Sequence, residues 1–161
     1  MANTYTQIHI QAVFSVQNRH SLISPNWQDE LYKYITGIVH KNKHKLLIIN
    51  GMPDHIHTLI GLRPSQSISD LMQDIKGSSS LWINQQGFLR TRFSWQEGYG
   101  AFSYCKPDLP KIINYILNQQ KHHQKKTFYE EYMELLKEFG ITHDERYVFK
   151  PVDYTISDQK T

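Results

Sequence analysis

Two histidines that stand two positions apart, His55 and His57, are the first residues of the sequence that suggest chemistry. They lie in an apolar, β-branched stretch that predicts a strand, so both imidazoles project from the same face. Two neighbouring imidazoles can bind one metal ion. Nine histidines in 161 residues give about 0.5 such pairs by chance, so two ordinary strand histidines are the slightly simpler interpretation of the pair alone. A histidine-triad hydrolase does not fit, because Leu59 stands where a third histidine is needed.

A phenol, an amide and an imidazole share one face of a helix predicted over residues 109–125. On a helical wheel, Tyr115, Gln119 and His122 fall within roughly 60° of one another. They flank an apolar stripe that consists of Leu109, Ile112, Ile113, Ile116 and Leu117. Tyr115 is one of ten tyrosines, and taken alone it is most simply a residue at the rim of a helix. No base that could activate it stands out in the sequence.

The elements that must position these residues follow from hydrophobic periodicity and turn residues. Strands are predicted at 5–16, 46–49, 55–62 and 99–104, and helices at 26–43, 67–85, 109–125 and 128–139. This order predicts an α+β fold of the ferredoxin-like (split βαβ, RRM-like) type, an antiparallel sheet with helices packed on one face. Residues 50–53 are predicted to be the turn between the second and third strands.

The second predicted helix begins at a candidate cap, Ser67. Its expected inner face consists of Ile68, Leu71, Met72, Ile75, Leu81 and Trp82. Residues 1–140 are expected to form one domain, and residues 141–161 a tail whose role the sequence does not indicate.

The composition favours a cytoplasmic protein without a membrane span. The single cysteine, Cys105, excludes an internal disulfide and a structural zinc finger. No apolar run approaches the ~20 residues that cross a bilayer. A formal charge of +3 allows an anionic partner but indicates none by itself.

Three segments together resemble the small HUH transposases of insertion sequences, which have one catalytic tyrosine. They are Met52 to His57, Trp95 to Ser103, and Tyr115 to Gln119 followed by His122 and His123. The resemblance covers roughly residues 4 to 130, with the motifs in the order of that family. It implies that the predicted third helix is the C-terminal helix that carries the catalytic tyrosine.

The resemblance also implies the roles of the site residues. His55, His57 and Gln119 are the expected ligands of a divalent metal, Mg²⁺ or Mn²⁺, and Tyr115 is the expected nucleophile. The expected reaction cleaves and rejoins single-stranded DNA at hairpin-bearing element ends through a 5′-phosphotyrosine intermediate. The resemblance further implies a homodimer, in which the tyrosine helix of one subunit can complete the metal site of the other.

Contacts with DNA phosphates are expected from Lys76, Arg90, Arg92 and Lys121, although a solvated basic surface explains each of them equally well. Two other functions stay open at this point. One is a domesticated or replication-initiator-like HUH nicking enzyme. The other is a non-catalytic module that binds single-stranded nucleic acid, which is a common use of ferredoxin-like sheets.

Overall fold

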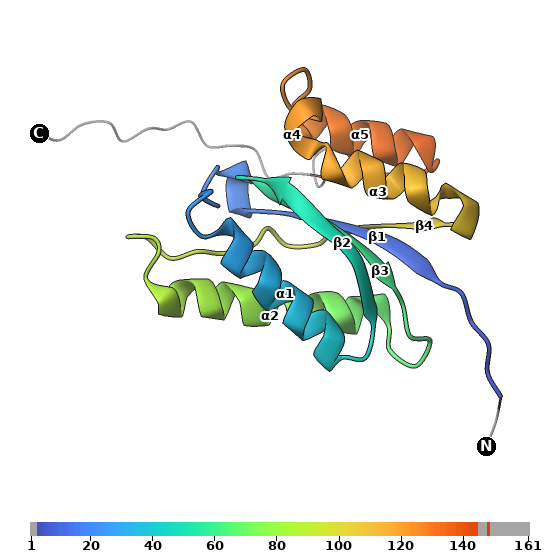
Figure 1. Cartoon of the computed structure of the whole chain (residues 1–161). Helices are drawn as coiled ribbons and strands as arrows, with labels where there is room; N and C mark the ends of the chain where they lie inside the picture. Colours follow the sequence, from blue (N-terminus) through green and yellow to red (C-terminus); the bar gives the residue numbers. More distant parts are fainter. Residues whose placement is uncertain (1–2, 145–147, 149–161) are drawn as a thin grey trace, which may run out of the picture.

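A four-stranded antiparallel sheet forms the centre of the protein (Figure 1). The structure, a computed structural model, describes residues 3–144 and Val148. The strands lie in the order β2-β3-β1-β4, which is the arrangement expected of a split βαβ fold. They are β1 (His9–Ser15), β2 (Lys45–Met52), β3 (His55–Gly61) and β4 (Gly100–Tyr104). Because β3 and β1 are central, both edges of each are hydrogen-bonded.

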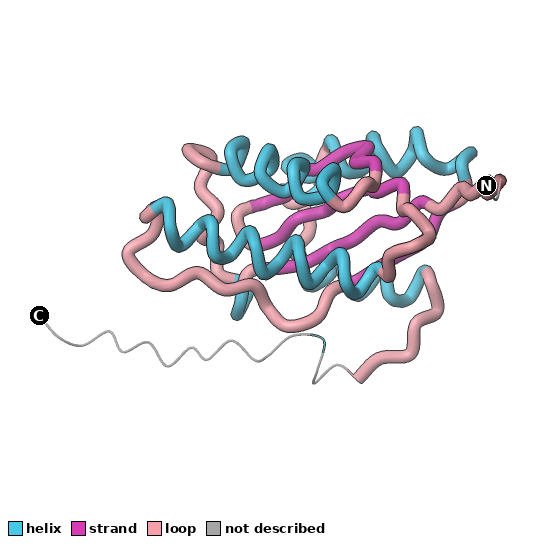
Figure 2. Tube along the Cα trace, turned by 90° about the horizontal axis from the view of Figure 1, so that it is seen from below, coloured by secondary structure: helices cyan, strands magenta, loops and turns pink. Residues whose placement is uncertain are grey.

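One face of the sheet is covered by α1 (Gln28–Lys41) and α2 (Ile68–Gln86), which lie side by side below the strands in Figure 1 and in front of them in Figure 2. The strand predicted at 5–16 alternates between the two faces, because Ala12 and Phe14 join the core on this face whereas Val13 joins the cluster on the other. The predicted cap is also confirmed, since the Ser67 hydroxyl accepts a hydrogen bond from the Asp70 amide over 3.1 Å.

The opposite face of the sheet carries the helices that follow the split βαβ unit. They are α3 (Leu109–Leu117), α4 (Gln119–His122) and α5 (Phe128–Glu138). Leu59 packs under α3, and Phe102 packs under α5. Two short 3₁₀ turns, η1 (Gln17–Arg19) and η2 (Lys106–Asp108), join the elements. Helices α1 and α2 pack on one face of the sheet, as expected, and the helix that carries Tyr115 lies on the opposite face.

Three expectations about local structure are wrong. The turn after β2 is formed by Pro53 and Asp54 and not by residues 50–53, because β2 stays paired with β3 through Met52. Leu81 is 59% exposed and so lies outside the inner face of α2. The helix predicted over 109–125 is interrupted at Asn118, which leaves Leu117 57% exposed.

The remaining expectations about the chain concern its ends and its surface. No helix in the described residues is long and apolar enough to cross a membrane. Cys105 is exposed and lies between β4 and η2. The division into a domain over 1–140 and a tail over 141–161 stays a prediction, since most of that tail lies outside the described residues.

Candidate active site

The two histidines lie at the start of β3, on the face of the sheet that α3, α4 and α5 cover. Both side chains are fully buried, and their rings meet edge to face with centroids 5.1 Å apart. Their backbone is held on both sides, since His57 pairs with Val13 of β1 and with Asn50 of β2. The period of two along a strand therefore places both imidazoles on one rigid surface.

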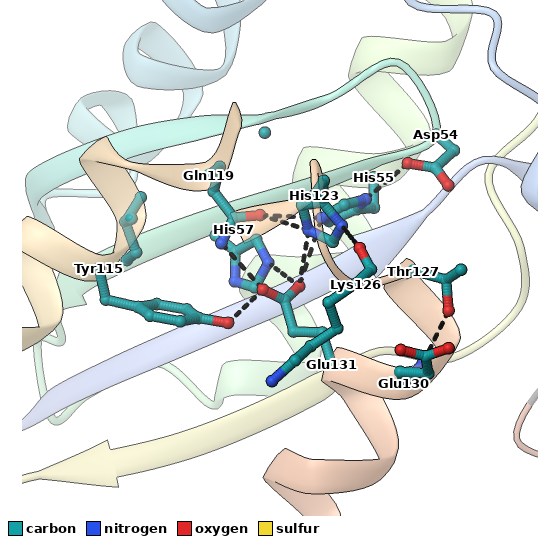
Figure 3. Close-up of polar contacts among 12 residues, drawn as sticks. Asp54, His55, His57, Tyr115, Gln119, His123, Lys126, Thr127, Glu130 and Glu131 are labelled. Carbon is teal, nitrogen blue, oxygen red and sulfur yellow. Dashed lines mark hydrogen bonds and ion pairs between the residues drawn. The ribbon is translucent and has the colours of Figure 1, made fainter. Parts of the chain in front are cut away.

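Tyr115 and Gln119 approach this surface from the end of α3 and the start of α4 (Figure 3). The Gln119 Oε1 atom lies 3.0 Å from His55 Nε2. The ring of Tyr115 lies edge-on to that of His57, with centroids 6.1 Å apart. The structure thus brings the predicted nucleophile and the three predicted ligands together in one chain. Their roles stay predictions.

The break between α3 and α4 is docked onto β2 by Asn50. The side-chain amide of Asn50 donates hydrogen bonds to the carbonyls of Ile116 (2.9 Å) and Leu117 (3.2 Å). Gln120 donates in turn to the Asn50 side chain and to the Gly51 carbonyl, over 3.3 Å each. The last carbonyls of α3 are thereby satisfied without a longer helix. The turn that separates Tyr115 from Gln119 is fixed relative to the histidine strand.

Glu131 of α5 is a site residue that the sequence interpretation missed. Its side chain is 2% exposed and lies at the centre of the cluster in Figure 3. Its Oε1 atom lies 2.9 Å from His57 Nε2 and 3.4 Å from His55 Nε2. Its Oε2 atom accepts hydrogen bonds from the Tyr115 phenol and from Gln119 Nε2. A single carboxylate therefore contacts all four predicted site residues.

His123 rather than His122 reaches this cluster. Its Nδ1 donates to the Lys126 carbonyl over 2.8 Å, and its Nε2 lies 3.1 Å from Gln119 Oε1 and 3.3 Å from Glu131 Oε1. His122, which the helical wheel placed beside the tyrosine, stacks on the ring of Tyr115 with centroids 4.6 Å apart. The interruption at Asn118 explains why a wheel drawn over one continuous helix does not bring His123 into the site.

The charges of the cluster depend on one another. Burial lowers the pKa of His55, but hydrogen bonds to Asp54 and Glu131 outweigh it and raise the pKa to about 9. The pKa of His57 is lowered, because the effect of burial is larger than that of the hydrogen bond to Glu131. Burial raises the pKa of Glu131, but hydrogen bonds from the histidines hold it well below its usual range. Without metal, the site contains a carboxylate balanced by an imidazolium.

The pKa of Tyr115 is raised far above its ordinary value. Burial of the phenol is the largest cause, and the charge of Glu131 adds to it. The phenol is therefore protonated in the metal-free protein, and its O–H donates a hydrogen bond to the Glu131 carboxylate.

Two further residues fix how the histidine rings are turned. Asp54 accepts the Nδ1–H of His55 over 2.6 Å, which leaves Nε2 to face Gln119. Gln11 Nε2 donates to His57 Nδ1 over 2.8 Å, and Tyr104 donates to Gln11 Oε1 over 2.8 Å. The Asp54 contact, in which a carboxylate accepts from the far nitrogen, is of the kind that orients histidine ligands in metal sites.

The residues present fit a divalent metal. Among the described residues, His55, His57 and Glu131 form a buried group whose ligand atoms all lie within 4.8 Å of one another. Gln119 Oε1 lies beside this group, 3.0 Å from His55 Nε2. Atoms bound to one small ion at about 2.1 Å lie roughly 3 Å apart, and three separations here are close to this value: 3.0 Å from His55 Nε2 to Gln119 Oε1, and 2.9 and 3.4 Å from Glu131 Oε1 to the Nε2 atoms of His57 and His55. The donors are two nitrogens and two oxygens, a set compatible with Mg²⁺ or Mn²⁺.

The four cations proposed to contact DNA differ in their surroundings. Lys76 Nζ donates to the carbonyls of Gln96 and Gly98 over 2.6 Å each, so this ammonium holds the loop before β4. Arg90, Arg92 and Lys121 are exposed. All four assignments stay predictions, and the three exposed cations fit the role better than Lys76.

A pattern within α5 could have revealed Glu131. The buried residues of this helix are Phe128, Glu131, Leu135 and Leu136, which follow the spacing of an amphipathic stripe. A carboxylate within an apolar stripe is unusual, because burying a charge is costly unless it is paired. The interaction of Glu131 with histidines of β3, however, could not be inferred from the helix alone.

The chain is similar in sequence to known proteins of one family. A family described as "Transposase IS200 like" matches residues 4–119. The ISDra2 transposase TnpA of Deinococcus radiodurans is 28% identical over 74 residues, 46% of this chain and 53% of that protein. The transposase for insertion sequence element IS200 of Salmonella typhimurium is 39% identical over 71 residues, 41% of this chain and 46% of that protein. Each match spans about half the length of the curated relative.

Two solved structures share the fold. A crystal structure of a protein from Deinococcus radiodurans, described as a transposase, has a TM-score of 0.60 and 22% identity and covers 74% of this chain and 96% of that one. A tyrosine transposase bound to a REP hairpin has a TM-score of 0.58 and 16% identity and covers 76% of this chain and 73% of that one. These likenesses show the predicted α+β fold, a four-stranded antiparallel sheet with helices packed against it.

Proposed function

The chain belongs to the IS200-like transposase family, and on that premise we propose that it cleaves and rejoins single-stranded DNA. Tyr115 is the nucleophile in this proposal, and His55, His57 and Gln119 bind a divalent metal. The observation that carries the proposal is the convergence of these four side chains, from two distant parts of the sequence, in one cluster.

Cleavage by this site is a displacement at phosphorus. The phenol oxygen of Tyr115 forms a bond to the scissile phosphorus while the bond from phosphorus to the 3′ oxygen breaks. The departing oxygen becomes a 3′-hydroxyl and takes up the equivalent of the proton that the phenol loses. The 5′-phosphotyrosine conserves the energy of the broken ester, so a second 3′-hydroxyl can reverse the step without ATP.

His55, His57 and Gln119 would hold a divalent ion, Mg²⁺ or Mn²⁺, whose positive charge would stabilise the negative charge that develops on the phosphate. The protein supplies the rest of the site. β3 holds two ligands rigidly, the turn docked by Asn50 holds Gln119, and Asp54 orients the ring of His55. His55, His57 and Gln119 are buried, whereas Tyr115 is half-buried and lines a cleft.

Two hollows of the surface differ in charge. A cleft of about 300 Å³ opens beside Tyr115, between α3 and α5, and its lining holds four carboxylates, of Asp108, Glu131, Glu134 and Glu138, against two lysines, which does not favour DNA phosphates. A wider groove of about 680 Å³ is lined in part by Gly61, the last residue of β3. Gly61 lies four residues beyond His57, which corresponds to about 13 Å along the strand. None of the residues that line this groove is acidic, and four are cations that suit phosphates: Lys43, Lys45, Arg63 and Lys106.

The proposed substrate is the hairpin-bearing end of a mobile element, and the proposed working unit is a homodimer in the cytoplasm. The family supports the substrate, as does the relative of similar fold that is bound to a REP hairpin. The exposed, unpaired Cys105 suits a reducing compartment.

The test is formation of a covalent adduct. Purified protein is incubated with labelled single-stranded DNA copied from the sequences that flank its gene, with and without Mn²⁺, and resolved on a denaturing gel. We expect a metal-dependent adduct from the wild type and none from Tyr115→Phe, because only the phenol oxygen is lost. Tyr5→Phe is the matched control, since Tyr5 is 89% exposed and far from the cluster in sequence.

Each outcome is informative once circular dichroism shows that the variants are folded. An adduct that persists in Tyr115→Phe contradicts the assignment of the nucleophile. Tight binding that is indifferent to metal and yields no adduct favours the non-catalytic binding module. Nicking without joining of two cut ends favours a replication-initiator-like enzyme.

A further inference from the structure

Glu131 lies outside the segment that matches the family, which ends at Gln119. Helix α5 delivers it to the site. Thr127 caps the helix by accepting a hydrogen bond from the Glu130 amide over 3.2 Å. Phe128 stacks on the ring of His55, with centroids 4.0 Å apart and planes 14° apart. Leu135 and Leu136 pack one turn further along. These contacts fix the face of α5 that carries the carboxylate.

The side chains around Glu131 are typical of a metal ligand and not of a carboxylate in an ordinary ion pair. Within the described residues, all its ion pairs are with histidines, and the nearby Lys126 pairs with Glu134 instead. A buried carboxylate without Lys or Arg is an expensive feature that stability alone does not explain. Imidazoles gathered around a carboxylate are, in contrast, the donor set of a metal site.

The two carboxylate oxygens have different surroundings. Oε1 faces the histidine nitrogens, 2.9 Å from His57 and 3.4 Å from His55. Oε2 accepts the hydrogen bonds of the Tyr115 phenol and the Gln119 amide. One side chain therefore spans from the metal ligands to the nucleophile (Figure 3).

We propose that Glu131 is a fourth protein ligand of the metal, through Oε1, and that its Oε2 positions the Tyr115 phenol beside that metal. This inference rests on the proposed function. It changes the charge of the site, because His55, His57 and Gln119 are neutral as ligands whereas Glu131 contributes one negative charge. A carboxylate oxygen raises the affinity for hard cations such as Mg²⁺ and Mn²⁺.

The ligand role is tested by Mn²⁺ affinity in the absence of DNA, measured by isothermal titration calorimetry and by the electron paramagnetic resonance signal of unbound Mn²⁺. Glu131→Gln keeps the size of the side chain and removes its charge, so we expect the affinity to fall at least about tenfold. Glu130→Gln is the matched control, because Glu130 is the exposed neighbour on the same helix and should leave the affinity unchanged. Equal Mn²⁺ affinities of Glu131→Gln and the wild type overturn the ligand role.

The positioning role is tested with Glu131→Asp, which keeps the charge but shortens the side chain by one methylene. At saturating Mn²⁺ we expect a rate of adduct formation at least about tenfold lower with an unchanged apparent DNA affinity, since the phenol loses its fixed acceptor. An unchanged rate overturns the positioning role. The wild type reports on the proposed function independently: if it binds Mn²⁺ and forms the adduct, a negative result with the variants concerns Glu131 alone.

Discussion

Asp54 stands immediately before the first histidine and accepts the Nδ1–H of His55 over 2.6 Å. The Asp54 side chain is 24% exposed, so this contact lies at the edge of the buried cluster. A carboxylate in this position fixes the orientation of the ring and makes Nε2 a more basic ligand for a metal ion. Asp54→Asn is therefore expected to lower Mn²⁺ affinity about 10- to 100-fold while the protein stays folded. Titration calorimetry with Mn²⁺ measures the loss.

The control for this change is Asp70→Asn on α2, which removes the same charge from an exposed position away from the cluster. It is expected to bind Mn²⁺ like the wild type. If both variants weaken binding equally, net charge rather than the orientation of His55 is responsible.

At the residue scale, the sequence led to part of the site. The period of two along a strand placed His55 and His57 on one face, whereas the roles of these histidines, Tyr115 and Gln119 were implied by the resemblance to HUH transposases. Glu131 could not be located in this way, because its contacts depend on how α5 packs on the sheet.

The β2–β3 hairpin holds the histidines, and its close approach depends on Gly51. A Cβ atom at this position would overlap the carbonyl oxygen of His55. Gly51→Ala is thus expected to lower the free energy of unfolding by roughly 1–3 kcal/mol or more, through strain in the hairpin. Urea denaturation followed by circular dichroism measures the change.

Gly77→Ala is expected to change the free energy of unfolding in the opposite direction and serves as the control. Gly77 is exposed in α2, and an added Cβ meets nothing within 4 Å. Alanine there is expected to raise the free energy of unfolding by about 0.5–1 kcal/mol, because glycine weakens a helix interior. Destabilisation by both variants would argue against a steric reason at Gly51.

At the element scale, the strands and most helices could be predicted from local periodicity. The interruption of the tyrosine helix at Asn118 could not, because it depends on Asn50, which lies 66 positions before Ile116. The apolar stripe runs on through Leu117 as though the helix were continuous. Long-range hydrogen bonds to the last carbonyls of α3 therefore decide where this helix ends.

At the scale of the whole molecule, the cluster is assembled within one chain, because α3, α4 and α5 fold back over the sheet that carries the histidines (Figure 1). If the active protein keeps this arrangement, two defective variants should not rescue each other. A His55→Ala/His57→Ala double variant co-refolded with Tyr115→Phe is expected to form no adduct with DNA, as judged on a denaturing gel. Wild type refolded in the same way is the control.

Recovery of the adduct in that mixture would contradict assembly within one chain. It would indicate that the tyrosine helix is exchanged between subunits, as the resemblance to HUH transposases allows. The order of elements along the chain, from which the fold class could be predicted, fixes the sheet but not which copy of the sheet the last helices cover.

The exposed Cys105 has a practical consequence for this question. It is the only thiol of the chain, and it lies where the sheet ends and the segment leading to the tyrosine helix begins. A nitroxide attached there would be the single spin label on an otherwise native protein. If Mn²⁺ binds the cluster, label and metal form a pair of paramagnets whose dipolar coupling reports on the movement of that helix during the reaction.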